Sequence, residues 1–213
     1  MNKDLTELVF ILDESGSMSG LESDTIGGFN SLIEKQRFDD GDVVVTTVLF
    51  NNEMNIIHDR VNIKEVKKLT KDDYQPKNCT ALLDAVGNTI LRISKKHNEL
   101  KEEFVPSKTM VIITTDGLEN ASKEFNYKKV KSLINKQTEL GWEFIFLGAN
   151  IDAVKEAYSL GICANNAVNY NCDEEGINLN YEALGSAIRS VKKEKCLGSD
   201  WRKKIDDDYK KRK

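Results

Sequence analysis

Residues 8–17 read LVFILDESGS, and this stretch decides the predicted fold. Its first five residues form an apolar run rich in valine, isoleucine and phenylalanine, which is typical of a strand covered on both faces. Asp13, Ser15 and Ser17 then follow at alternate positions. Open α/β sheets bind ligands in the crevice beyond the carboxyl ends of such strands. We therefore expect three oxygen-bearing side chains at a binding edge, and oxygen donors favour a hard divalent cation over zinc or copper.

Strand-like and helix-like segments alternate along the rest of the chain. β-branched or continuous apolar runs predict strands at 43–50, 108–115, 142–147 and 167–170, and 54–58 reads as an antiparallel hairpin partner at the sheet edge. Apolar residues at spacings of three and four predict helices over about 24–37, 81–97, 126–140, 152–159 and 181–191. This alternation predicts an α/β fold: a doubly wound, mostly parallel sheet of about six strands, with one antiparallel edge strand and helices on both faces.

Bulk composition excludes several classes of protein. The chain has 213 residues, of which 39% are hydrophobic and 31% charged, so we expect one domain over residues 1–198. Residues 199–213 read as a charged, fraying tail. The net charge of −4 argues against nucleic acid as the partner, and no run approaches the roughly 20 apolar residues of a membrane span. With no signal peptide evident, we expect a cytoplasmic protein with free, mostly buried cysteines at 79, 163, 172 and 196.

Two further residues join the first motif at the predicted binding edge. Asp116 follows the strand at 108–115, and Thr80 lies in the loop that opens the helix at 81–97. With Asp13, Ser15 and Ser17 they supply two carboxylates and three hydroxyls. Such a set fills an octahedral Mg²⁺ or Mn²⁺ shell only with the help of water. Two negative charges neutralise a dication and leave it able to attract a carboxylate from another molecule.

Three separated motifs carry a family resemblance. Asp13-x-Ser15-x-Ser17, residues 80–85 (TALLDA) and residues 115–120 (TDGLEN) resemble a von Willebrand factor A-type (VWA) domain, of the compact bacterial and phage kind. The resemblance extends over about residues 7–190. It implies a metal-ion-dependent adhesion site (MIDAS) in which Ser15, Ser17 and Thr80 are hydroxyl ligands and Asp13 and Asp116 bind directly or through water. It also implies that Asp84 is structural and that Glu119 and Asn120 shape the adjoining loop.

The chain departs from the family pattern at two places. Glu14 stands where relatives often carry a basic or polar residue, and it either adds negative charge near the cation or faces solvent. Asn78-Cys79 stands where relatives usually carry glycine in the loop before Thr80, which we call the threonine loop. Asparagine tolerates left-handed backbone, so the turn is expected to survive.

The sequence thus predicts a protein-binding module rather than an enzyme. Its Mg²⁺ or Mn²⁺, in preference to Ca²⁺, captures an acidic residue of a partner protein. Two alternatives remain: a metal-dependent hydrolase such as a phosphatase or nuclease, and a scaffold with a structural metal. Serine hydrolysis needs a base and a nucleophile elbow, but no Gly-x-Ser-x-Gly occurs, and His58 and His97 read as surface residues.

Overall fold

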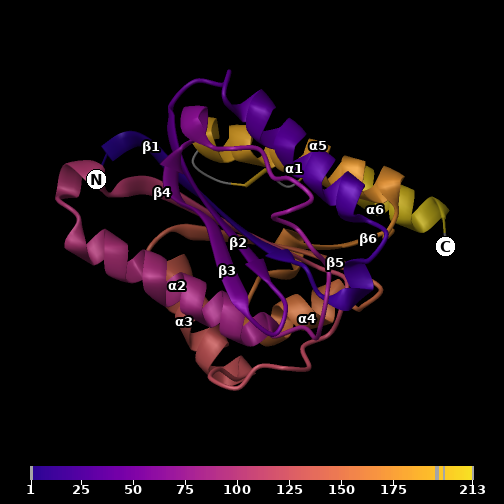
Figure 1. Ribbon diagram of the computed structural model, residues 1–213. Helices are drawn as coiled ribbons and strands as arrows, with labels where there is room; N and C mark the ends of the chain where they lie inside the picture. The colour runs from indigo at the N-terminus through magenta and orange to yellow at the C-terminus, as the bar shows by residue number, and fades with distance from the viewer. Residues whose placement is uncertain (1, 195–196, 199, 213) are drawn as a thin grey trace.

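A six-stranded mixed sheet forms the centre of the molecule (Figure 1). The structure is a computed structural model that describes residues 2–194, 197–198 and 200–212. The strand order is β3-β2-β1-β4-β5-β6, and every neighbouring pair is parallel except β2 and β3. The strands are β1 (Asn2–Asp13), β2 (Asp42–Phe50), β3 (Met54–Asn62), β4 (Pro106–Thr115), β5 (Trp142–Ala149) and β6 (Ala167–Tyr170). The predicted fold class, including the antiparallel edge strand, is confirmed.

Helices cover both faces of this sheet (Figure 1). One face carries α1 (Glu22–Gln36) and α5 (Glu174–Glu194), and α6 (Lys203–Lys211) lies on the same side. The other face carries α2 (Leu82–Glu99), α3 (Tyr127–Glu139) and α4 (Ala153–Leu160). Side chains alternate between the two cores, because Leu8 and Phe10 pack toward α1 and α5 whereas Val9 and Ile11 pack toward α2 and α3. The apolar run of β1 is therefore buried on both faces, as its composition predicts.

The helix boundaries follow local signals in the sequence. The side chain of Asn126 caps α3 by accepting a hydrogen bond from the backbone N–H of Lys129. Gly141, which follows the C-cap residue of α3, and Gly161, the C-cap residue of α4, adopt positive φ, the left-handed region that glycine enters without steric cost. Several elements are longer than expected: β1 begins at Asn2, β3 continues to Asn62, β5 continues to Ala149, and α5 begins at Glu174. Among the described residues, no helix has the length and apolarity needed to cross a bilayer.

The expectation of a fraying tail is wrong for the described residues 200–212. They contain α6, which packs against β6 and α5 and buries Trp201 and Ile205. The Trp201 indole N–H donates to the carbonyl of Asn165. Arg202 donates to the carbonyls of Ala164 and Ala167, beside and at the start of β6. Two large buried side chains outweigh the fraying expected of a highly charged segment.

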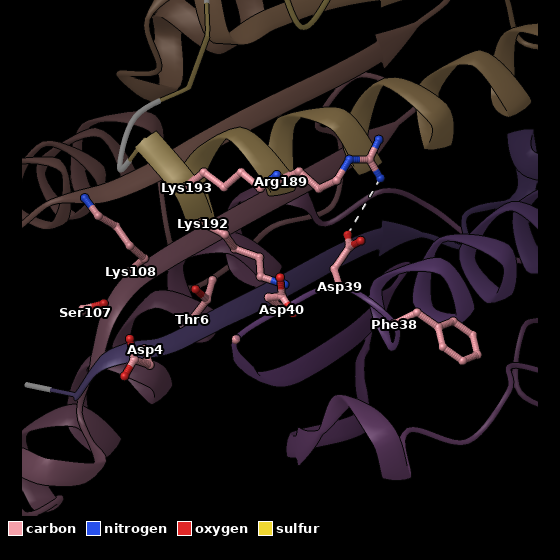
Figure 2. Close-up of a pocket in the computed structure, with 11 residues that line it drawn as sticks. Asp4, Thr6, Phe38, Asp39, Asp40, Ser107, Lys108, Arg189, Lys192 and Lys193 are labelled. Atoms are coloured by element: carbon pink, nitrogen blue, oxygen red, sulfur yellow. Dashed lines mark ion pairs between the residues drawn. The ribbon is translucent and has the colours of Figure 1, made fainter.

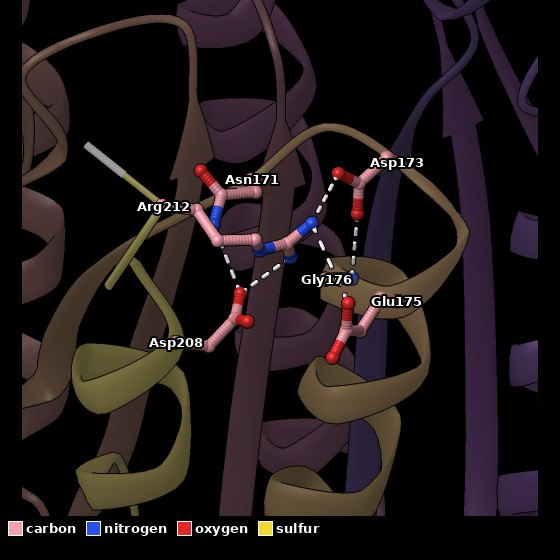
Figure 3. A network of polar contacts seen from close by, with 6 residues as sticks. All are labelled: Asn171, Asp173, Glu175, Gly176, Asp208 and Arg212. Carbon is pink, nitrogen blue, oxygen red and sulfur yellow. Dashed lines mark hydrogen bonds and ion pairs between the residues drawn. The ribbon is translucent and has the colours of Figure 1, made fainter. Parts of the chain in front are cut away.

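The far end of α6 is fixed as well (Figure 3). Arg212 bonds Asp173 and Asp208 at 2.5 Å each, and Asn171 donates to Asp208 at 2.9 Å. These contacts join α6 to the loop between β6 and α5. Because this loop leaves the carboxyl end of β6, α6 reaches the edge of the sheet at which the predicted site lies.

The histidines and cysteines also differ from expectation. His58 is buried and its Nδ1 lies 3.0 Å from the Thr47 hydroxyl, while His97 contacts the fully buried Glu7 at 2.6 Å. Neither is a surface residue. Cys79 and Cys163 are exposed rather than buried, Cys172 is half-buried, and all three are free thiols. Cys196 lies outside the described residues.

Candidate functional site

The carboxyl ends of β1 and β4 bring the predicted residues together. β1 lies in parallel register with β4, so Asp13 at the end of β1 and Asp116 just after β4 reach the same edge of the sheet. Ser17 links the two segments: its hydroxyl donates to Asp116 Oδ1 at 2.5 Å, and its oxygen lies 3.2 Å from that of Ser15. Asp13, Ser15 and Asp116 are buried, whereas Ser17 is exposed. Ser17 therefore marks the solvent side of the site.

Asp13 is held by two hydrogen-bond donors. Its Oδ1 accepts the backbone N–H of Ser15 at 2.7 Å, and its Oδ2 accepts the hydroxyl of Thr115 at 2.6 Å. The Tyr74 hydroxyl donates to the Asp13 carbonyl at 2.5 Å. Sequence reasoning missed Thr115 and Tyr74. Thr115 had a usable signal, since it is the last residue of a buried strand and adjoins Asp116, but no local pattern connects Tyr74 to β1.

The hydroxyls of Thr80 and Ser17 both lie next to Gly117. A Cβ atom on Gly117 would lie 3.3 Å from Thr80 Oγ1 and 3.7 Å from Ser17 Oγ, so both oxygens flank the same backbone position. The Thr80 backbone is fixed from two sides, because its N–H donates to Asn120 Oδ1 and its carbonyl accepts the N–H of Asn120. Thr80 itself is buried. The structure thus places all five predicted residues around one edge of the sheet.

The unusual threonine loop keeps its turn. Asn78 has φ of +63°, in the left-handed region that asparagine enters more readily than most residues. Its carbonyl accepts the N–H of Gly16 at 3.0 Å, which ties the threonine loop to the first motif. Cys79, the next residue, is exposed. The expectation that asparagine preserves this turn is confirmed.

Glu14 does not face solvent. It is buried, its Oε1 accepts from the Asn51 side chain at 3.2 Å, and its Oε2 accepts the Gln75 N–H at 3.5 Å. Burial raises the pKa of Glu14 above its ordinary value. Its carboxylate thus connects the loop after β2, through Asn51, with the loop before Thr80, through Gln75.

The roles expected for Asp84, Glu119 and Asn120 are confirmed as structural. The Asp84 carboxylate accepts three consecutive backbone N–H groups, those of residues 123, 124 and 125, at 2.7–3.0 Å. Glu119 accepts the N–H groups of Leu83, Ala121 and Ser122 at 2.7–2.9 Å. These bonds fasten the loop after Asp116 to the start of α2.

The electrostatics of the site suit a cation. Burial is the main cause that raises the pKa of Asp13 and that of Asp116 above their ordinary values, and hydrogen bonds from Thr115 and Ser17 oppose it. In the described part of the chain, neither carboxylate has a lysine, arginine or histidine partner within ion-pair distance. Buried carboxylates are normally paired with a cation or a metal. The donor set of two carboxylates and three hydroxyls fits Mg²⁺ or Mn²⁺.

Other metal-binding chemistry is not evident elsewhere. Across residues 2–194, 197–198 and 200–212, no group of three or more histidine, cysteine, aspartate or glutamate side chains could hold a metal ion. The candidate site differs from such a cluster because most of its donors are hydroxyls.

A separate cavity of about 390 Å³ lies at the opposite edge of the sheet (Figure 2). It is lined by charges of both signs from the amino ends of β1 and β4, the segment after α1 and the end of α5. Arg189 and Asp39 face each other there at 3.8 Å. None of the predicted site residues lines this cavity.

Comparison with solved structures agrees with the topology. Proximal thread matrix protein 1 from the mussel byssus is similar at a TM-score of 0.61 and 17% identity, over 86% of this chain and 46% of that one. A form of it described as having a zinc-occupied MIDAS motif is similar at 0.59 and 15%. The D319A mutant of the PilB minor pilin from Streptococcus sanguinis is similar at 0.60 and 11%, over 90% of this chain and 62% of that one.

The chain thus spans about half to three fifths of the length of these structures. No protein-family model matches it, and no curated protein sequence does. At such low identity the likeness concerns the fold alone. The chain has a VWA-like fold.

Proposed function

We propose that this chain is a protein-interaction module that binds its partner through a divalent cation. Asp13, Ser15, Ser17, Thr80 and Asp116 hold Mg²⁺ or Mn²⁺, and the ion receives an acidic side chain of the partner. The VWA-like fold and the zinc-occupied MIDAS motif of a structural neighbour support this proposal.

One observation carries the proposal. Asp13 and Asp116 are buried at the same edge of the sheet, and the described structure offers them hydroxyl donors but no basic side chain. A buried carboxylate without a counter-charge opposes folding, because its desolvation is not offset by an opposite charge. A bound dication removes that penalty, so the arrangement is best explained as a cation site.

The carboxylates and the hydroxyls of the site have different roles in binding the ion. The Ser15 N–H and the Thr115 hydroxyl hold the Asp13 carboxylate in a fixed orientation. The three hydroxyls add ligands without adding charge, so the net charge of the occupied site stays near zero. A bound ion supplies a Lewis-acidic position for an incoming carboxylate. The exposed Leu118, beside the site, is available to contact the same partner.

Calorimetric titration with Mg²⁺, Mn²⁺ and Zn²⁺ tests the site directly. Wild type should bind at least one of these ions, Asp116→Ala should not, and Asp59→Ala should behave as wild type because Asp59 is an exposed residue of β3. Equal binding by wild type and Asp116→Ala would contradict the assignment. Zinc is included because it occupies the motif of the mussel protein.

Two further measurements separate the proposed module from the alternatives. A partner bridged by the ion should be retained from native cells in Mg²⁺ and released by EDTA, whereas a structural metal predicts retention that ignores EDTA. A screen with a phosphomonoester and with nucleic acid tests for hydrolysis. Sustained turnover that Asp116→Ala abolishes would replace the binding module with an enzyme.

A further inference from the structure

A basic helix borders an apolar hollow away from the candidate metal site. α3 carries four lysines and one glutamate, although the whole chain has a net charge of −4. Between α2 and α3 lies a hollow of about 400 Å³, lined by Leu91, Phe125, Lys128, Lys129, Ser132 and Leu133. We call it the α2–α3 groove. It combines an apolar floor with a positively charged rim.

The apolar floor is partly open to solvent. Leu91 on α2 is 47% exposed, and Phe125 and Leu133 are only partly buried. The fully buried residues of α3 are others, Val130, Ile134 and Gln137, whereas Phe125 and Leu133 pack against the edge of the core and keep part of their surface in solvent. Apolar side chains grouped in a hollow with a polar rim are typical of a protein-interaction surface.

The floor is also fixed in place. Phe125 packs directly on α2, where Gly87 leaves room for its ring: a Cβ atom on Gly87 would lie 2.4 Å from Phe125 Cδ1. The Asp84 carboxylate accepts the Phe125 N–H at 2.8 Å, which anchors the same residue through its backbone. A floor held by both its side chain and its backbone loses little entropy when a partner binds.

The charges of the rim define the partner. The Lys128 side chain is exposed and has no ion-pair or hydrogen-bond partner within the described structure, and the Lys129 ammonium donates to the Glu124 carbonyl. Lys136, further along α3, lies outside the groove in a neighbouring hollow that Lys128 and Glu139 also line, and it continues the positive charge along the helix. Carboxylates placed opposite these lysines would be attracted, whereas a basic partner would be repelled.

We propose that the α2–α3 groove binds an acidic amphipathic helix of a partner protein. A third helix can pack along two neighbouring helices, with apolar residues at i, i+3 or i+4 and i+7 on the floor and glutamates or aspartates against Lys128 and Lys136. The 13 residues of α3 offer a length of about 20 Å for this contact. Phosphate backbones would use the lysines but not the apolar floor, which disfavours nucleic acid. The contact needs no metal.

Fluorescence anisotropy with synthetic peptides tests this surface. The probe is a labelled 14-residue helical peptide with leucines at i, i+3, i+7 and i+10 and glutamates flanking them, and its counterpart carries lysines in place of the glutamates. The glutamate peptide should bind wild type saturably, more weakly at high salt, and equally in Mg²⁺ and EDTA. The double variant Leu91→Ser/Lys128→Glu should bind it at least roughly tenfold more weakly.

The matched control is Leu140→Ser/Lys68→Glu, which changes an exposed leucine and an exposed lysine outside the groove and should bind as wild type. Circular dichroism should show that both double variants fold, because the substituted residues are exposed. The proposal is overturned if the glutamate peptide does not bind, if it binds the groove variant as tightly as wild type, if the lysine peptide binds as well, or if a single-stranded oligonucleotide displaces it. Peptide binding in the groove is expected to be the same in Mg²⁺ and in EDTA. The result can therefore be interpreted even if the candidate metal site binds no ion.

Discussion

Replacing Asp13 by asparagine should separate the stability of the fold from its capacity to bind a cation. Asparagine has nearly the same shape, and its amide oxygen can still accept the Ser15 N–H. The Thr115 hydroxyl can turn to the Gly117 carbonyl, 3.1 Å away, and accept from the new amide N–H₂. The substitution therefore removes a buried charge and preserves the hydrogen bonds around it.

In EDTA, Asp13→Asn should be at least as stable as wild type. Burial raises the pKa of Asp13, so keeping it ionised at pH 7 opposes folding, by about 1.4 kcal/mol for each unit by which the pKa is raised. We expect the variant to gain on the order of 1 kcal/mol. For a chain of this size that corresponds to a rise in Tm of about 2–4 °C.

In Mg²⁺ the order should reverse. At a concentration about 100 times its Kd, the ion stabilises a protein that binds it only when folded by about 2.7 kcal/mol, a rise of roughly 5–11 °C in Tm. Asp13→Asn should lose this gain, whereas Asp59→Asn should keep it. Thermal and urea unfolding with and without Mg²⁺ measure both effects. A variant that keeps the full Mg²⁺ gain, or that loses several kcal/mol in EDTA, would refute the reasoning.

The same variant carries a pH signature. Because the folded-state pKa of Asp13 is raised above its ordinary value of 3.8, its unfavourable contribution in EDTA is absent at low pH and develops as pH rises through the folded-state pKa. The stability of Asp13→Asn relative to wild type should therefore increase with pH. Groups with lowered pKa, such as Glu182, act in the opposite direction but are common to both proteins. A difference that stays constant with pH would contradict this.

Three further substitutions test other parts of the structure. Gly87→Ala should displace the Phe125 ring, lower the free energy of unfolding by about 1–3 kcal/mol and weaken peptide binding in the α2–α3 groove, while the stabilisation by Mg²⁺ persists. Asp84→Ala should leave three backbone N–H groups without their acceptor and destabilise the fold by about 2 kcal/mol in urea unfolding, an effect that Asp59→Ala should not reproduce. Glu7→Gln should remove the anion that pairs with Arg60 inside the sheet and lower the free energy of unfolding by about 3–5 kcal/mol; a loss below 1 kcal/mol would show that this pair is inconsequential.

The regular elements were predictable because they depend on local pattern. A continuous apolar run predicts a buried parallel strand such as β1, and apolar residues spaced three and four positions apart predict a helix such as α2. The boundaries were less predictable at the edge of the sheet. β3 continues to Asn62 through exposed and half-buried residues, because its backbone pairs with β2 as far as Val44 and Asn62, although its side chains do not form an apolar run.

Placing the site was possible because parallel topology converts separate motifs into neighbours. Once Asp13 and Asp116 are assigned to the ends of parallel strands, their proximity follows. The supporting contacts were not accessible in the same way. Tyr74 reaches the Asp13 carbonyl from a loop without regular structure, and His58 is buried at an edge strand where exposure is the usual expectation. The charge composition of residues 199–213 also led to a wrong prediction, because it does not show that the buried side chains of Trp201 and Ile205 hold α6 in place.

The docking of α6 has a consequence for how this protein is made. During synthesis the sheet can grow outward from β1 as each strand emerges, but α6 follows β6 only after the whole of α5. Until then the nascent chain presents an open outer strand, the kind of edge that recruits other strands and leads to misassembly. Arg202 and Trp201 cover the start of this strand when they bond to the carbonyls of Ala164, Asn165 and Ala167, the last of which is the first residue of β6. The docking of α6 should thus protect this edge from aggregation, and expression of a chain truncated before residue 200 should give inclusion bodies.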